Sequence, residues 1–168
     1  RLPLLIDTDN PIYESSAKNK RTDFAIRWSH YFDEFEVALS HFSGTSREPR
    51  LMPSVKKFNH LTPYYEKINQ TGLEALYLIG GLALKLEAIR RSGQGDTFSA
   101  ATAGFEYTQV GIADSRIDLG WILEVNHDDR LRSSPFVVGT RLTFNDSYDS
   151  QILSGMFINE KTEEIGVL

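Results

Sequence analysis

The sequence contains no cysteine, no long apolar run and no excess of basic residues, and each absence excludes a class of protein. Without cysteine the chain has no disulfide scaffold, no thiolate metal site and no cysteine nucleophile. Helical membrane spans need about 20 mostly apolar residues in succession, and no such run occurs. The chain has 18 basic and 23 acidic residues, which gives a formal charge of −5. We therefore expect no nucleic-acid partner bound through phosphate neutralisation.

The length and the two ends of the chain predict a piece of one domain. A chain of 168 residues falls within the range of about 100–200 residues that usually forms a single domain. Arg1 stands where an initiator methionine would be, and no signal-peptide pattern precedes the first strand. Residues 165–168 turn apolar again, as if a further strand were beginning. We therefore expect residues 1–168 to be an internal fragment of a single β-barrel domain.

The main pattern of the chain is an alternation of apolar and polar residues with a period of two, which predicts β-strands. Phe24, Ile26 and Trp28 fall on one face of the first such segment, and Arg27 falls on the other. A Gly80-Gly81 pair between two later segments is typical of a tight hairpin turn. The predicted strands, with no convincing long helix between them, cover residues 23–32, 35–42, 73–79, 82–89, 98–109, 116–126, 136–144 and 150–158.

The connections between these segments predict an up-and-down meander. Residues 1–22 and 43–71 are expected to be loops, because Pro49, Pro53 and Pro63 argue against an interior strand and 63–70 suggests one or two helical turns. Short turns are expected near residues 33, 80, 112 and 147, and longer connections at 92–97 and 127–135. Outer-membrane barrels have this asymmetry, with short turns at one rim and long loops at the other. The predicted fold class is all-β, an antiparallel up-and-down transmembrane β-barrel.

The alternation also divides the strands into an apolar face and a charged face. In a membrane barrel the apolar face contacts lipid and the charged face lines the interior, whereas in a soluble barrel or sandwich the apolar face is the core. Periodicity alone does not decide between these settings. The charged face is expected to carry Arg27, Glu36, Glu74, Lys85, Glu87, Glu106, Asp118, Glu124 and Arg141.

Three features favour lipid as the neighbour of the apolar face. Most predicted strands are about 9–12 residues long, near the length of a tilted membrane span and above the usual length of soluble strands. Aromatic residues gather toward strand ends, as they do at membrane interfaces. The charged face also carries Gly104, Gly120 and Gly139, and such small residues suit a crowded barrel interior.

Several stretches resemble a family of uncharacterised outer-membrane β-barrel proteins of Gram-negative bacteria. They are residues 23–32, 37–49, 84–98 and 104–108, and the likeness extends from Asp23 to about Phe144. The resemblance implies a porin-like barrel in the bacterial outer membrane, and it brings no activity or catalytic residue with it. The chain departs from that pattern at its ends, where neither a leader nor a closing aromatic strand is present.

No residue pattern predicts catalysis, a cofactor or a metal site, so we do not expect an enzyme. His30, His41, His60 and His127 have none of the short spacings of metal ligands. Neither Ser29-His30 nor Ser40-His41 pairs a nucleophile with its base, because adjacent strand residues point to opposite faces.

The charged residues are the remaining candidates for function. Arg27 and Glu36 fall in one hairpin and are expected to form an ion pair, and Lys85, Glu87 and Arg141 are the best candidates for contact with a solute. Charged side chains inside a barrel either select solutes or fill the interior. The residues expected to face the lumen are Arg27, Glu36, Lys85, Glu87, Glu106, Asp118, Glu124 and Arg141.

The sequence thus predicts an outer-membrane protein, a porin-like channel or a structural barrel, with membrane lipid as its partner and small solutes as further candidates. The alternative is a soluble lipocalin-like barrel that binds a small ligand on its apolar face. An outer-membrane hydrolase ranks third.

Overall fold

The structure is a computed structural model that describes residues 4–131, 134–159 and 164–167. The chain forms two compact units, each assembled from separate stretches of sequence. The first unit comprises Arg1–Ile26, Ser40–Thr71 and Arg91–Thr97, and the second comprises Arg27–Leu39, Gly72–Arg90 and Phe98–Leu168.

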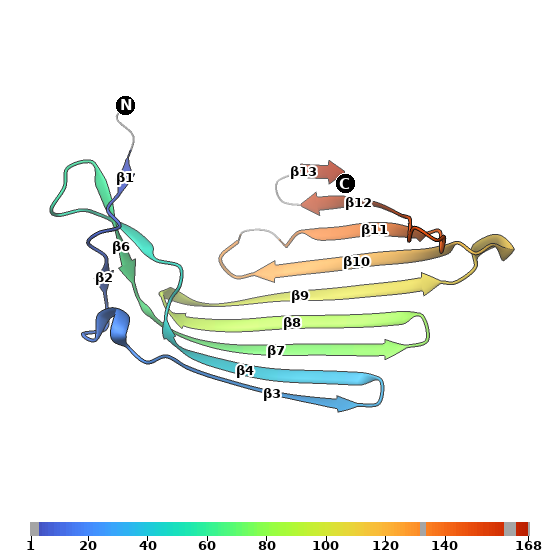
Figure 1. The fold of residues 1–168 in the computed structure, drawn as a ribbon, viewed down its shortest axis with the longest axis horizontal. Coiled ribbons are helices and arrows are strands. Elements are labelled where there is room, and N and C mark those ends of the chain that lie inside the picture. Colours follow the sequence, from blue (N-terminus) through green and yellow to red (C-terminus); the bar gives the residue numbers. More distant parts are fainter. Residues whose placement is uncertain (1–3, 132–133, 160–163, 168) are drawn as a thin grey trace. The chain divides into compact units, whose positions relative to one another are not determined.

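The larger sheet is an antiparallel meander in which strands that follow one another along the chain lie side by side (Figure 1). Its order is β13-β12-β11-β10-β9-β8-β7-β4-β3. Eight long strands and the short β13 make up this sheet, so the antiparallel meander expected from the alternation is confirmed. The bounds are β3 Phe24–Phe32, β4 Phe35–Thr45, β7 Lys67–Ile79, β8 Leu82–Gly93, β9 Gly95–Gln109, β10 Asp118–Asp128, β11 Phe136–Thr143, β12 Gln151–Asn159 and β13 Glu164–Val167.

A second, smaller sheet lies in the first unit, within segments that the sequence analysis assigned to loops. It contains β1 (Leu5–Ile6), β2 (Ile12–Tyr13), β5 (Arg50–Pro53) and β6 (His60–Tyr65), and a 3₁₀ turn, η1, covers Lys18–Lys20. Strand β6 is central, with β1 and β2 parallel to it and β5 antiparallel. The prediction of uninterrupted loops over 1–22 and 43–71 is therefore wrong, as is the prediction of helical turns in 63–70.

Pro63 is tolerated inside β6 because one edge of β6 has no partner strand at that position. On this edge β1 pairs with His60 and Leu61, and β2 pairs with Tyr64 and Tyr65, so Pro63 falls between the two, while on the other edge it lies opposite Leu51 of β5. The Leu61 and Tyr65 carbonyls accept hydrogen bonds from β1 and β2 residues or their neighbours, so the backbone at Pro63 faces the same unpaired edge, where a missing N–H costs no ladder bond. The three prolines in 43–71 are therefore compatible with strands in this segment.

The sheet differs from the expected barrel in its closure and in its connections. Strands β3 and β13 stand at the two ends of the sheet and do not pair with each other, so the described residues form an open sheet. Residues 92–97 are not a long loop, because β8 ends at Gly93 and β9 begins at Gly95. Conversely, the turn near 112 is longer than expected and contains a 3₁₀ turn, η2, at Ile112–Asp114. The predicted contrast between a short-turn rim and a long-loop rim is correspondingly weak.

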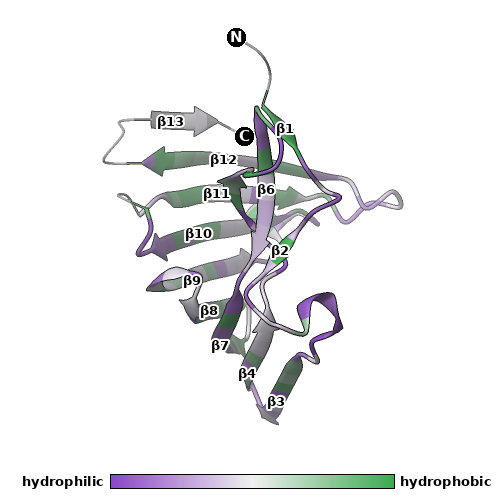
Figure 2. Ribbon diagram, turned by 90° about the vertical axis from the view of Figure 1, so that its left-hand side faces the viewer, coloured by the Kyte–Doolittle hydropathy of each residue, from purple (hydrophilic) through white to green (hydrophobic). Residues whose placement is uncertain are grey.

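Very little hydrophobic surface is buried. Among described residues the buried hydrophobic side chains are Ala38, Ile68 and Phe98. The two 3₁₀ turns, of three residues each, are the only helices in the described parts of the chain, so no helical layer covers the large sheet there. Figure 2 shows apolar segments along β10, β11 and β12 on a sheet that is one layer thick.

Candidate functional site

The charged face of the large sheet is the candidate site, and the strand register brings its members together on β9, β10 and β11. Ile122 lies opposite Glu106 on β9, and Gly120 lies opposite Arg141 on β11. Since side chains alternate along a strand, Asp118, Gly120, Ile122 and Glu124 share this face. Glu106, Glu124 and Arg141 therefore lie on one side of the sheet.

Two ion pairs connect this face across the remaining strands. Lys85 Nζ on β8 lies 2.8 Å from Glu106 Oε1 on β9. Arg27 Nη2 on β3 lies 2.8 Å from Glu74 Oε2 on β7. Glu36, Glu74, Lys85 and Glu87 also line one depression, so β4, β7 and β8 contribute to the same face. All nine residues that the sequence placed on the charged face share one side of the sheet.

The partner of Arg27 differs from the expected one. The sequence predicts an ion pair between Arg27 and Glu36 of the adjacent strand, but the ion pair of Arg27 is with Glu74, two strands away in the sheet order. Strand β4 lies between them, and its Ala38 is only 2% exposed. A small side chain at this position leaves room for the guanidinium to reach across β4. Half of each partner's side chain remains exposed, so the pair is accessible to solvent.

The other members of the charged face have different partners or none. Glu124 accepts a hydrogen bond from the Asn126 side chain at 3.0 Å. Asp118 accepts hydrogen bonds from the Asn145 side chain and from the Gly111 N–H, at 2.8 and 2.9 Å, and so ties two connections to the end of β10. Within the described residues, Glu36, Glu87, Glu124 and Arg141 form no ion pair, so carboxylates are in excess on this face.

Two glycines of the charged face lie beside the long cations of β8 and β11. A Cβ atom on Gly104 would lie 3.6 Å from Lys85 Cβ, and one on Gly120 would lie 3.6 Å from Arg141 Cβ and 3.7 Å from its Nε, which are ordinary van der Waals distances. Two of the three small residues noted in the sequence thus adjoin the stems of Lys85 and Arg141, whereas Gly139 adjoins Ser154 and Gly155 of β12.

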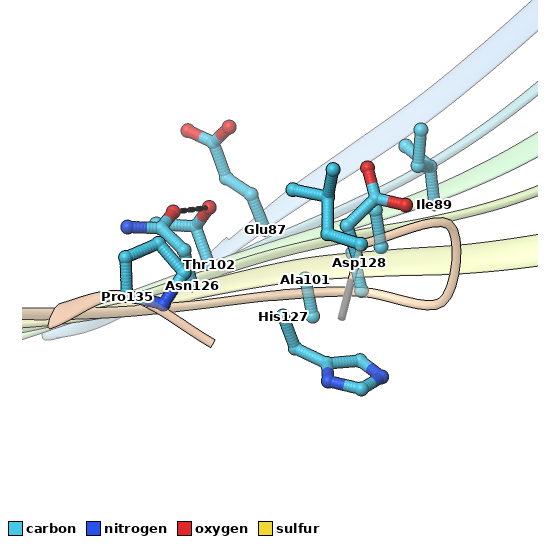
Figure 3. A pocket seen from close by; sticks show the side chains of 11 residues that line it. Glu87, Ile89, Ala101, Thr102, Asn126, His127, Asp128 and Pro135 are labelled. Carbon is cyan, nitrogen blue, oxygen red and sulfur yellow. Dashed lines mark hydrogen bonds between the residues drawn. The ribbon is translucent and has the colours of Figure 1, made fainter. Parts of the chain in front are cut away.

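Residues 87–89 of β8, 100–102 of β9 and 126–128 at the end of β10 line a shallow pocket of about 340 Å³ (Figure 3). Glu87, Thr102 and Asn126 project to one side of the strands, and His127 projects to the other. The Thr102 hydroxyl donates a hydrogen bond of 2.7 Å to the Asn126 side-chain oxygen. The polar part of this pocket is thus continuous with the charged face.

The opposite side of the sheet is apolar and exposed. We call it the apolar face. The register places Trp121 beside Tyr107 and Thr140, and Leu123 beside Phe105 and Val138. The register also shows which residues of β12 lie on the apolar face, which the sequence alone did not determine. Met156 pairs with Val138, and Ile152 pairs with Leu142. Large side chains of this face that are exposed include Leu84, Leu86, Phe105, Tyr107, Trp121, Leu123, Val125, Val138, Ile152 and Met156.

His127, at the end of β10, meets an aspartate and a serine of the connection that follows, which the sequence did not predict. His127 lies 3.4 Å from Ser134 Oγ through Nδ1 and 3.0 Å from Asp129 Oδ1 through Nε2. Asp129 also accepts the Ser99 N–H at 2.7 Å. The histidine and aspartate side chains are about half exposed, so this cluster lacks the enclosed, water-excluding environment in which such triads activate a nucleophile. These contacts brace the connection.

The first unit contains a further polar cluster that sequence reasoning missed. The buried Asp7 carboxylate accepts hydrogen bonds from Lys57 Nζ at 2.9 Å and from the Asn10 amide at 3.0 and 3.2 Å. The hydrogen bond from Lys57 lowers the pKa of Asp7, and the same bond raises the pKa of Lys57. Asp7 and Lys57 are separated by 50 residues, so no local spacing could reveal this pair.

Neither a metal site nor a membrane helix is found in the described part of the chain. No group of three or more His, Cys, Asp or Glu side chains there is arranged to hold a metal ion. No helix among the described residues has the length and apolar character needed to cross a membrane.

The fold and the site define a mostly-β protein with a large open antiparallel meander. Its charged face also carries the exposed Leu153, and the other face is mainly apolar. Comparison of the chain with protein families, with curated proteins and with solved structures gave no match. The two faces of the sheet are therefore the main evidence on function.

Proposed function

We propose that this chain forms part of the wall of an outer-membrane β-barrel, with the apolar face toward lipid and the charged face toward the barrel interior. The barrel would act as a passive channel or as a structural barrel in a Gram-negative bacterium. The observation that carries the proposal is the exposure of large apolar side chains across the face of β8–β12 that lies opposite the ion pairs.

An exposed apolar surface of this extent needs a partner in water. Soluble monomers rarely expose contiguous apolar patches above a few hundred Å², and a soluble sheet packs its apolar face against a second layer. Within the second unit, the described residues form one sheet and supply no such layer. Lipid acyl chains would cover this face without any further protein.

Strand length also supports a membrane setting. The eight long strands have between 8 and 15 residues, and β3, β4, β10 and β12 have 9, 11, 11 and 9. A tilted membrane-spanning strand needs about 9–11 residues, whereas soluble strands most often have about 5–6. The resemblance of residues 23–144 to outer-membrane barrel proteins points the same way.

The charged face suits a wet interior better than lipid. Lys85, Glu106, Arg27 and Glu74 remain partly exposed, and charged groups of this kind are costly in the hydrocarbon region. The open edges at β3 and β13 require additional strands, from this or another chain, to complete a wall.

Two adjacent residues of β10 provide the test, because Leu123 and Glu124 point to opposite faces and the chain has no cysteine to interfere. Leu123→Cys and Glu124→Cys would each be labelled with a fluorophore after reconstitution into vesicles. We expect brominated lipids to quench the label at residue 123 strongly and the label at 124 weakly. Trp28 and Trp121, both on the apolar face, should be quenched as well.

The opposite result would overturn the proposal. A soluble protein in which a water-soluble quencher reaches the label at residue 124 but not the label at 123 would identify the apolar face as an interior core. That outcome is the one expected of a lipocalin-like ligand binder. Equal quenching at both positions would contradict both orientations, the apolar face toward lipid and the apolar face as an interior core.

A further inference from the structure

The loop between β5 and β6 carries two apolar side chains that almost nothing covers. Val55 is 94% exposed and Phe58 is 93% exposed, the most exposed large hydrophobic residues in the described part of the chain. Lys56 and Lys57 lie between them in the sequence. Further exposed apolar residues, Leu51 and Met52, lie on the adjoining β5. This segment therefore combines exposed apolar groups with positive charge.

Charge is distributed unevenly between the two units. The first unit has ten basic and seven acidic residues, and the second has eight basic and sixteen acidic residues. The net charge of −5 thus divides into +3 and −8. The unit that carries the exposed loop is the one whose charge would attract an anionic surface.

A pocket of about 440 Å³ lies beside this loop. Lys18 of η1 and Lys56 contribute basic groups, and neither ammonium forms an ion pair with another described residue. Asp9 is the one acidic group of its described lining, and Val55 contributes an apolar edge.

We propose that the 54–59 loop and this pocket dock the first unit on a membrane surface of anionic lipid. Val55 and Phe58 would enter the boundary between headgroups and acyl chains, and Lys18 and Lys56 would contact lipid phosphates. Anionic lipid fits better than a protein groove because the cations and the apolar side chains occupy one exposed segment, as they do in peripheral membrane-binding surfaces. This docking does not depend on the second unit spanning the membrane.

The test places a polarity-sensitive fluorophore on a single introduced cysteine. Val55→Cys reports on the loop, and Val110→Cys is the matched control, since Val110 is 76% exposed and belongs to the second unit. The full chain would be titrated with vesicles of phosphatidylcholine alone and with vesicles that also contain phosphatidylglycerol. We expect a blue shift at residue 55 with the anionic vesicles only, weakened by high salt, and no such shift at residue 110.

Substitutions measure the electrostatic and the apolar contributions to vesicle binding separately. Lys18→Gln and Lys56→Gln should each weaken the interaction about fivefold, as expected for one lysine near an anionic surface. Phe58→Ser should weaken it about tenfold or more through lost apolar burial. Tyr148→Ser, at a residue that is 89% exposed in the second unit, should have little effect.

Three outcomes would overturn the docking proposal. They are no shift at residue 55 with anionic vesicles, an equal shift at residue 110, and a shift that inorganic phosphate alone reproduces. Quenching of Trp28 and Trp121 by brominated lipids measures the lipid contact of the second unit independently. Failure of the docking proposal is therefore distinguishable from failure of the barrel proposal.

Discussion

At the scale of single residues, Asp7 is the most completely buried charged residue in the described part of the chain. Its side chain is 1% exposed, and it holds Lys57 and Asn10 together across the first unit. The Asp7 N–H also donates to the Leu61 carbonyl at 2.8 Å, next to the pairing of β1 with β6. One residue thus connects the N-terminal segment to the small sheet through both its backbone and its side chain.

The pKa directions of this pair predict how the first unit responds to pH. The pKa of Asp7 is lowered, so its stabilising contribution is present above the ordinary carboxyl pKa and is lost as pH falls through the lowered value. The pKa of Lys57 is raised, so its contribution is present below the ordinary ammonium value and is lost as pH rises through the raised one. We expect Asp7→Asn to reduce amide protection in β1 and β6 at neutral pH. As the pH is lowered, amide protection in this variant should fall less than in the unmodified chain.

Hydrogen exchange of the β1 and β6 amides measures this effect. Asp149→Asn is the control, because Asp149 is an exposed carboxylate in the connection between β11 and β12. If Asp7→Asn and Asp149→Asn gave the same protection at every pH, the ion pair would have no role in holding β1.

At the scale of elements, the turn between β8 and β9 is unusually tight. Gly93 has φ +104° and Gly95 has φ +74°, so both adopt a backbone conformation that favours glycine. A Cβ atom on Gly93 would also clash with the Lys67 carbonyl oxygen, whereas one on Gly95 would meet nothing within 4 Å. Gly95 thus has only the cost of a positive φ, whereas Gly93 has that cost and a steric clash with Lys67 as well.

Alanine substitutions at these two positions should have unequal effects. Gly95→Ala should cost about 1–2 kcal/mol through the positive φ alone. Gly93→Ala should cost more, because the carbonyl of Lys67 must also move. The fraction of folded protein after refolding, followed by protease resistance, compares the two variants. Equal losses would mean that the close approach to Lys67 is relieved without cost.

The sequence predicted the long strands well because period-two alternation is a local property of the chain. All eight expected segments contain a strand of the large sheet. What it missed lacks such a local pattern. Strands β1 and β2 pair with β6 across long sequence separations, and β5 and β6, although neighbours in the sequence, are short and contain prolines; none of these four strands shows alternation. Residues 92–97 contain turn-forming residues, but two glycines confine the turn to one residue.

The candidate site was predictable as a face but not as a set of pairs. Alternation was enough to collect Lys85, Glu106 and Arg141 on one side of the sheet. Which residues pair depends on register and on the size of intervening side chains, and neither is a property of one strand. Arg27 reaches Glu74 past Ala38, and no pattern within the first hairpin indicates this.

For the molecule as a whole, the faces and the charge distribution lead to a property of the proposed barrel. The second unit carries eight basic and sixteen acidic residues, and carboxylates outnumber cations on its charged face. If this face lines a water-filled path, its potential is negative and raises the local concentration of cations. The proposed barrel should therefore conduct cations in preference to anions.

Removing the unpaired carboxylates tests this preference. In planar bilayers under a salt gradient, the reversal potential of the unmodified chain should indicate selectivity for potassium over chloride. The combined variant Glu36→Gln, Glu87→Gln and Glu124→Gln should move that potential toward zero, because none of these carboxylates forms an ion pair with another described residue.

The matched control removes the same number of charges from turns, through Asp33→Asn, Glu34→Gln and Asp149→Asn, all at exposed positions. It should shift the reversal potential less, since exposed turn charges are screened by salt within about 10 Å at 0.1 M. A larger shift in this control would place the selective charges at the rim instead of the charged face. A channel with no preference would contradict the assignment of the charged face to the interior, and the absence of any conductance would leave the structural barrel as the remaining form of the proposal.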